Sequence, residues 1–481
     1  MKMRHQELAI FGIQLALMAF IVLPFRVMAA AEPPGTADDA TLTQPYQIER
    51  HDETNVRERH GFSLTACFNR ANVNNKEIAL AESNLPISQA AVVIAKAIPN
   101  PTFNMIYGFG PAWAYIIAGN NQQIGWNEEI QVAGKRTKKT NLAHSNYLQT
   151  AFEVEAVRFA VHNRVRRAYA ELMMASAYAR LTQVQEDVFQ KLFSIAQKRY
   201  IAGKAPGSEV LQAKLNLMQL ATQHNVARNR LVSDSTQLDF LLGESPNSEE
   251  IFVMDDLNLY NLLAGRSEIV PPPDRGVPEL SQLLPAAWRQ RNDLRAAIQQ
   301  AYCDRKALTL AKAQRIPDPF LGFNYLYSTY KPFQLQYFTP VSGAQKVPYQ
   351  PGYMFTVAEE TPIFYQYQGE VNQAKATWLQ QLKENNQLRT QAAADIVSAY
   401  EALVVSIKNL HAFQEDLLPA ALQAAHLSRR SYELGKTDLA TAILAEQQYG
   451  QLASAYFDCA VTYHNNGADL EKAVGIPLKL Q

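Results

Sequence analysis

The stretch Tyr200-Ile-Ala-Gly203-Lys204 returns later in the chain as Tyr432-Glu-Leu-Gly435-Lys436. A Pro-x-Pro pair also recurs upstream, as Pro99-Asn-Pro101 and then Pro317-Asp-Pro319, at a slightly shorter spacing. Chance can produce one such match, but several matches in the same order indicate two copies of one unit. Three further pairs keep the spacing of the first motif: Ala213 with Ala445, Leu238 with Leu470, and Gly243 with Gly475.

This duplication predicts how the chain is organised. We expect a first repeat over residues 62–243 and a second repeat over residues 286–481, joined by a linker over residues 244–285. A flexible N-terminal segment is expected over residues 32–61. The different spacings of the two motifs predict an insertion in the second repeat, within the Pro-rich stretch 331–352.

The N-terminal segment 1–31 has the pattern of a secretory signal peptide. Lys2 and Arg4 give a positive start, a mostly apolar run follows over residues 8–23, and Ala29-Ala30-Ala31 offers small residues for cleavage. A single membrane anchor is the alternative, but the run is shorter than the ~20 residues that a spanning helix needs. No long charge-free apolar stretch follows, so the sequence predicts no later transmembrane helix. It does not exclude a transmembrane β-barrel.

Strict alternation of side chains predicts strands over about residues 102–132 and 319–362. Large apolar residues take one face of each, and small or polar residues take the other. These strands match the ~9–11 residues that a tilted strand needs to cross a bilayer. A soluble hairpin packed on the helices is the alternative. The apolar set is Phe103, Met105, Tyr107, Phe109, Trp113, Tyr115, Ile117, Ile124, Trp126, Ile130, Val132, Leu321, Phe323, Tyr325, Tyr327, Tyr353, Phe355 and Val357.

Apolar residues spaced by three and four predict long coiled-coil helices over about residues 134–242 and 366–474. Pro419 interrupts the second pattern, and we expect a kink or break there. Each long helix is expected to turn back at its tip, where Gly203 and Gly435 suit left-handed caps. Ser208 and Asp438 are the predicted N-caps of the two returning helices.

Four strands per chain are too few to close a membrane barrel. An open sheet edge cannot face lipid, because each unpaired backbone group there costs several kcal/mol. Other copies of the chain must therefore complete the sheet, and closed cyclic symmetry is the simple solution. The predicted fold class is mainly α with a transmembrane β-barrel. The sequence physics leaves a dimer, trimer or tetramer open.

The duplicated Pro-x-Pro pairs and Tyr-x-x-Gly-Lys tips, with the repeat ends at Gly243 and Gly475, resemble the TolC family of outer-membrane efflux proteins. The stretch Glu129-Ile-Gln-Val-Ala-Gly134-Lys135-Arg136 is similar to a signature of the CzcC-like heavy-metal efflux subgroup. This resemblance implies a homotrimer with a twelve-stranded barrel in the outer membrane and a long periplasmic α-helical barrel. It also implies docking to a periplasmic adaptor and an inner-membrane RND-type pump, with metal cations or drugs as substrates.

The same resemblance assigns roles at the tips. It implies adaptor docking by Tyr200, Gly203, Lys204, Tyr432, Gly435 and Lys436. It also implies an acidic residue that narrows the pore entrance, a place that Glu209 occupies. An equally weighted alternative is that Glu209 only stabilises the N-terminus of its own helix through its negative charge. In the second repeat the corresponding acidic positions hold Thr441 and Leu444, so Asp438 is the expected substitute.

The rest of the sequence argues against other functions. The 45 basic and 45 acidic residues cancel, which disfavours a nucleic-acid partner. No motif of a metalloprotease, nucleophile elbow or phosphate loop occurs, so we predict no enzyme, catalytic residue, cofactor or metal site. The polar cluster at residues 51–60 is interpreted as a surface segment. Two further hypotheses stay open: a conduit of type I protein secretion, and a soluble periplasmic coiled-coil scaffold.

Overall fold

The computed structural model describes residues 57–60, 63–107, 121–244, 250–253, 278–328 and 350–477. Three sequence predictions lie outside these residues: the signal peptide over 1–31, the alternating positions Phe109 to Ile117, and most of the insertion over 331–352. Most of the segment 32–61 and the middle of the linker also fall outside them.

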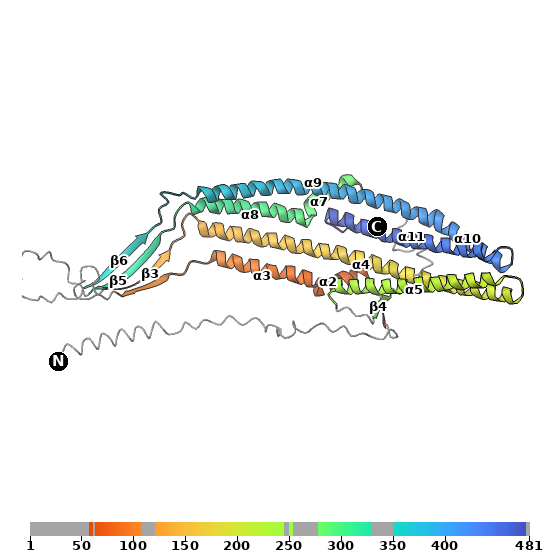
Figure 1. Ribbon diagram of the computed structural model, residues 1–481. Helices are drawn as coiled ribbons and strands as arrows, with labels where there is room; N and C mark the ends of the chain where they lie inside the picture. Colours follow the sequence, from red (N-terminus) through yellow and green to blue (C-terminus); the bar gives the residue numbers. More distant parts are fainter. Residues whose placement is uncertain are drawn as a thin grey trace, which may run out of the picture. The chain divides into compact units, whose positions relative to one another are not determined.

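The duplication is visible in the order of the elements (Figure 1). Two short helices, a β-hairpin and a long helical hairpin follow one another, and the same order then returns. The first copy consists of α2 (Leu64–Asn74), α3 (Lys76–Lys96), β2 (Thr102–Tyr107), β3 (Asn121–Glu129), α4 (Lys135–Ile201) and α5 (Gly207–Leu242). The second consists of α7 (Leu280–Gln290), α8 (Asn292–Gln314), β5 (Phe320–Ser328), β6 (Gln350–Ala358), α9 (Gln368–Ala412), η3 (Phe413–Leu417), α10 (Leu418–Glu433) and α11 (Leu439–Val474).

The short helices α2, α3, α7 and α8 did not follow from the sequence pattern. Each pair is broken by one residue with extended backbone, Asn75 in the first copy and Arg291 in the second. Asn75 Nδ2 donates to Leu241 O at 2.7 Å, and Arg291 Nη1 donates to Ala473 O at 3.2 Å. The two acceptors hold equivalent positions near the ends of α5 and α11, so different side chains cap the same helix end in each copy. Helix α7 begins at Leu280, inside the predicted linker.

The returning helices both end at left-handed glycines. Gly243 has φ +74° and Gly475 has φ +81°. A side-chain carbon at Gly243 would lie 2.1 Å from Asn74 O, and one at Gly475 would lie 2.6 Å from the Cα of Arg291. Backbone conformation and close approach therefore both require glycine at these positions.

The four long strands form one antiparallel sheet in the order β2-β3-β5-β6. Among the described residues, this order leaves β2 and β6 as open edges. A second, parallel pair joins β1 (Arg57–His60) to β4 (Glu250–Val253). The sequence places these two segments in a flexible region and a linker and does not predict that they pair.

The predicted alternation of the strands is confirmed. Phe103 lies opposite Trp126, which lies opposite Phe323, which lies opposite Phe355. The four aromatic residues therefore share one face of the sheet. That face is open in the single chain, since Phe103 and Trp126 are each 57% exposed and Phe355 is 78% exposed. Small and polar residues make up most of the opposite face, which also carries Ile106, Leu326 and Met354.

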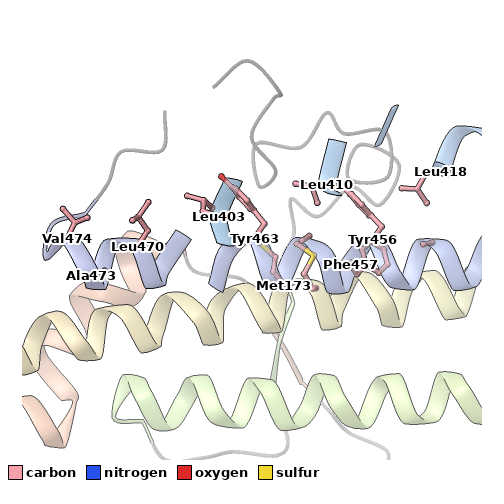
Figure 2. Close-up of a cluster of buried hydrophobic side chains, with 14 of the residues drawn as sticks. Met173, Leu403, Leu410, Leu418, Tyr456, Phe457, Tyr463, Leu470, Ala473 and Val474 are labelled. Atoms are coloured by element: carbon pink, nitrogen blue, oxygen red, sulfur yellow. The ribbon is translucent and has the colours of Figure 1, made fainter. Parts of the chain in front are cut away.

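Helix α4 has 67 residues and so extends for about 100 Å. It packs along α5, α3, α8 and α11, and α9 packs along α8 and α11. The largest apolar cluster fills the space between α4, α9 and α11. Figure 2 shows Tyr456 and Tyr463 of α11 beside Leu410 and Leu403 of α9.

The second long helix is interrupted where the sequence predicted a kink. The short π-helix η3 ends at Leu417, and Pro419 lies in the first turn of α10. Proline fits there because the first residues of a helix have amide groups without intrahelical partners.

The sequence predicts no membrane-spanning helix after the signal peptide, and the composition of helix α3 differs from that prediction. By length and composition alone, it is the one helix among the described residues that is apolar enough to cross a membrane.

Candidate functional site

The two tip turns have the same backbone. Gly203 N donates to Tyr200 O, and Gly435 N donates to Tyr432 O, both at 2.9 Å. The backbone amide of the next residue, Lys204 or Lys436, donates to the carbonyl one residue earlier, Arg199 O or Ser431 O, also at 2.9 Å. Both glycines have positive φ, of +67° and +72°. The pair of bonds closes each helix with a left-handed cap, as the sequence predicted.

The returning helices begin differently from one another. Asp438 is an N-cap as predicted, because its Oδ1 accepts from Thr441 N at 3.4 Å and also from the Thr441 hydroxyl. These hydrogen bonds, led by the one from the hydroxyl, lower the pKa of Asp438. Ser208 is not an N-cap. Helix α5 begins one residue earlier at Gly207, behind Pro206, and has no side-chain cap.

Tyr432 joins the two hairpins. Its side chain is completely buried, and its hydroxyl donates to Glu209 Oε2 at 3.3 Å. Arg199 lies over the ring, 4.7 Å from the centroid, and its Nη1 donates to Tyr432 O at 3.2 Å. Burial and the Glu209 carboxylate together raise the pKa of Tyr432, so the phenol keeps its proton and stays a donor. Glu209 therefore does more than favour its helix N-terminus.

The equivalent Tyr200 has the opposite environment, since it is 54% exposed. Gly203, Lys204, Gly435 and Lys436 are also exposed. The predicted docking residues thus fall into two groups: five on the surface of the tips, and Tyr432 inside. Ile201 and Leu434, which the sequence did not single out, add apolar surface beside the two turns.

Sequence reasoning also missed a buried ion pair in the second hairpin. Arg429 Nη1 of α10 lies 3.2 Å from Glu446 Oε1 of α11, and the Glu446 side chain is 6% exposed. Burial raises the pKa of Glu446, although Arg429 opposes this effect. The signal was present in the sequence, because Glu446 interrupts the apolar stripe that contains Leu439, Ala442 and Ile443.

A second buried pair lies where the sheet meets the helices. Lys135 Nζ is 2.8 Å from Asp318 Oδ2, with side-chain exposures of 6% and 15%. Asp318 Oδ1 also accepts from Val132 N at 2.9 Å. Asp318 is the middle residue of the second Pro-x-Pro pair, and Lys135 belongs to the Gly-Lys-Arg stretch. The two motifs therefore meet in the fold, and their contact joins the start of β5 to the start of α4.

A groove of about 420 Å³ runs between α4, α5 and α11. Within the described ranges, no group of three or more His, Cys, Asp or Glu residues is arranged to hold a metal ion. Six of the fourteen residues that line the groove carry carboxamides: Gln185, Asn216, Gln219, Gln223, Gln447 and Gln451.

Comparison with solved structures finds the same fold in outer-membrane channels. CusC is 17% identical, with a TM-score of 0.68 over 90% of this chain and 97% of its own. The Campylobacter jejuni channel CmeC is 19% identical, with a TM-score of 0.65 over 86% and 85%. The Neisseria gonorrhoeae channel MtrE is 18% identical, with a TM-score of 0.60 over 86% and 89%. No curated protein matches the sequence.

The chain thus shares with these channels a duplicated fold, in which the described residues form a four-stranded antiparallel sheet and two long helical hairpins. Residues 68–244 match the outer membrane efflux protein family, which covers most of the first repeat. The similarity to the CzcC-like subgroup stays a prediction.

Proposed function

We propose that the chain is one protomer of an outer-membrane channel-tunnel that carries solutes passively out of the periplasm, within a tripartite efflux system. The observation that carries this proposal is the four-stranded sheet, with an exposed aromatic face and two open edges. Lipid can cover the aromatic face, but an open edge in lipid leaves backbone amides and carbonyls unpaired. Other copies must therefore complete the sheet.

A homotrimer satisfies this requirement. Three copies of a four-stranded sheet supply twelve strands, within the range of known closed membrane barrels. The same rotation places six helical hairpins below the barrel, two from each chain. The aromatic face then meets the bilayer, the polar face lines the lumen, and the helices extend into the periplasm. A soluble scaffold gives no reason for Tyr353, Phe355 and Val357 to be 68%, 78% and 71% exposed.

The tips are the proposed docking surface for a periplasmic adaptor and, through it, an RND-type inner-membrane pump. Two exposed lysines, Lys204 and Lys436, follow rigid left-handed turns and stand beside exposed apolar residues. Glu209 is the proposed acidic group at the pore entrance, and the Tyr432 hydroxyl fixes its position.

Membrane fractionation tests the channel proposal. We expect a heat-modifiable trimer in the outer-membrane fraction, and a soluble monomer would overturn the proposal. Deletion of the gene should sensitise cells to metal salts or drugs while exported proteins remain at wild-type levels. Unchanged resistance together with lost protein export would instead favour the secretion conduit.

Charge reversal at the tips tests docking separately. Lys204→Glu with Lys436→Glu should abolish resistance and adaptor co-purification while trimers persist. The matched control is Lys383→Glu, at an exposed lysine of α9 outside the tips. Normal efflux through trimers with both tip substitutions would contradict the docking role.

A further inference from the structure

The polar face of the sheet carries carboxamide side chains laid over glycines. In one row of the register, Asn104, Gly125, Asn324 and Met354 lie opposite one another. Asn104 Nδ2 donates to Asn324 Oδ1 at 3.4 Å, and Asn324 Nδ2 donates to Thr356 Oγ1 at 3.4 Å. Asn324 is only 2% exposed, so the neighbouring side chains cover it.

Glycine makes this arrangement possible. A side-chain carbon at Gly125 would lie 2.1 Å from Asn324 Oδ1, closer than nonbonded atoms approach. In the adjacent row, a carbon at Gly322 would lie 2.2 Å from Asn127 Oδ1 and 2.1 Å from Thr356 Oγ1. Each amide therefore occupies the space above a neighbouring glycine instead of projecting away from the sheet. The two glycines and two amides alternate between β3 and β5, so both strands take part.

The composition of the two faces indicates which one is concave. A sheet that closes into a barrel crowds the side chains on its inner face and spreads those on its outer face. Glycine and flat amides suit the inner face, while the exposed aromatic residues suit the outer face. Asn127 and Gly322 lie two residues from the ends of β3 and β5 that adjoin the helices, whereas Gly125 and Asn324 are the central residues of these two strands.

We propose that Asn104, Asn127 and Asn324 of each copy form a carboxamide collar around the lumen, held flat by Gly125 and Gly322. The collar keeps the bore open between the middle of the described strands and their helix-side ends. The partly exposed Asn104 and Asn127 offer passing solutes both hydrogen-bond donors and acceptors without net charge, while the covered Asn324 accepts from Asn104 and holds it in place. The collar therefore sets how fast polar solutes pass but does not select for the sign of their charge, unlike a ring of acidic side chains. This inference rests on the proposed channel function.

Single-channel recording of the full-length trimer in planar bilayers with KCl tests the collar. Asn127→Asp keeps the shape of the side chain and adds one negative charge per copy, so the reversal potential in a salt gradient should shift toward cation selectivity. Gly125→Ala and Gly322→Ala should lower the conductance without moving the reversal potential, because the amides must shift into the lumen. Asn127→Asp keeps both glycines, so it tests the collar even where the alanine variants fail to assemble.

Cysteine modification gives an independent readout with a matched control. Asn127→Cys should react with a charged, membrane-impermeant methanethiosulfonate reagent and change the conductance. Val357→Cys, on the aromatic face, should not. The native Cys67 and Cys303 should not react with the reagent, because burial raises the pKa of each thiol to about 11. A wild-type protein that forms no channels would overturn the proposed function. Channels with an unmoved reversal potential in Asn127→Asp and an unreactive Asn127→Cys would overturn the collar alone.

Discussion

The Tyr432 hydroxyl donates to the Glu209 carboxylate across 3.3 Å, and this hydrogen bond joins the two helical hairpins of the chain at their tips. The equivalent tyrosine of the first repeat, Tyr200, is exposed to solvent instead. The two copies of one motif thus serve different purposes, one holding the hairpins together and the other presenting surface.

Removing this hydroxyl should loosen the tips without disturbing the core. Tyr432→Phe keeps the ring beneath Arg199 and removes only the bond to Glu209, which should destabilise the contact by about 1 kcal/mol. Hydrogen exchange of the amides near residues 199–209 should become faster. Tyr200→Phe is the matched control and should leave exchange unchanged. Equal effects of the two variants would contradict the asymmetry between the tyrosines.

The left-handed glycines should differ in their tolerance to alanine. A left-handed conformation costs a non-glycine residue about 1–2 kcal/mol, and this applies to both Gly435 and Gly475. At Gly435 the added carbon meets open space, whereas at Gly475 it would lie 2.6 Å from the Cα of Arg291. Gly475→Ala should therefore lower the melting temperature more than Gly435→Ala. The reverse order would show that the close approach of α11 to Arg291 is unimportant.

The parts of the fold that follow from local patterns could be predicted. The alternation of apolar and polar side chains in the strands, the three-four spacing of apolar residues in the helices and the Gly-Lys turns are all local patterns. Because each occurs in both repeats, they could be recognised in the sequence. The breaks at Asn75 and Arg291 could not be predicted, because each depends on a carbonyl at the far end of its own repeat. Strands β1 and β4 were missed for the same reason, since two very short strands pair across the whole first repeat. Tyr200 and Tyr432 sit in the same motif, and only tertiary packing decides which is buried.

The buried Glu446 should make stability depend on pH in a defined direction. Burial raises its folded-state pKa above the ordinary 4.5, so the folded state binds this proton more readily than the unfolded state. Its contribution to stability is therefore largest below pH 4.5 and declines as the pH rises through the folded-state pKa. Glu446→Gln should flatten this part of the unfolding free energy measured from about pH 4.5 to about pH 7. Exposed Glu433→Gln is the control, and an unchanged slope in Glu446→Gln would show that the carboxyl is effectively solvated.

The Lys135–Asp318 pair should be the most sensitive contact between the strands and the helices. Asp318→Asn gives the second Pro-x-Pro pair the residue that the first pair has at Asn100, yet it leaves the Lys135 ammonium buried without its counter-charge. We expect a loss of about 3 kcal/mol in stability, seen as a lower melting temperature of the detergent-solubilised protein. Lys135→Met combined with Asp318→Asn removes both charges and should recover much of the loss, so the pair should show a coupling energy in a double-mutant cycle. Additive effects of the two substitutions would show that Lys135 finds other partners, such as the carbonyl of Ile316 to which it also donates.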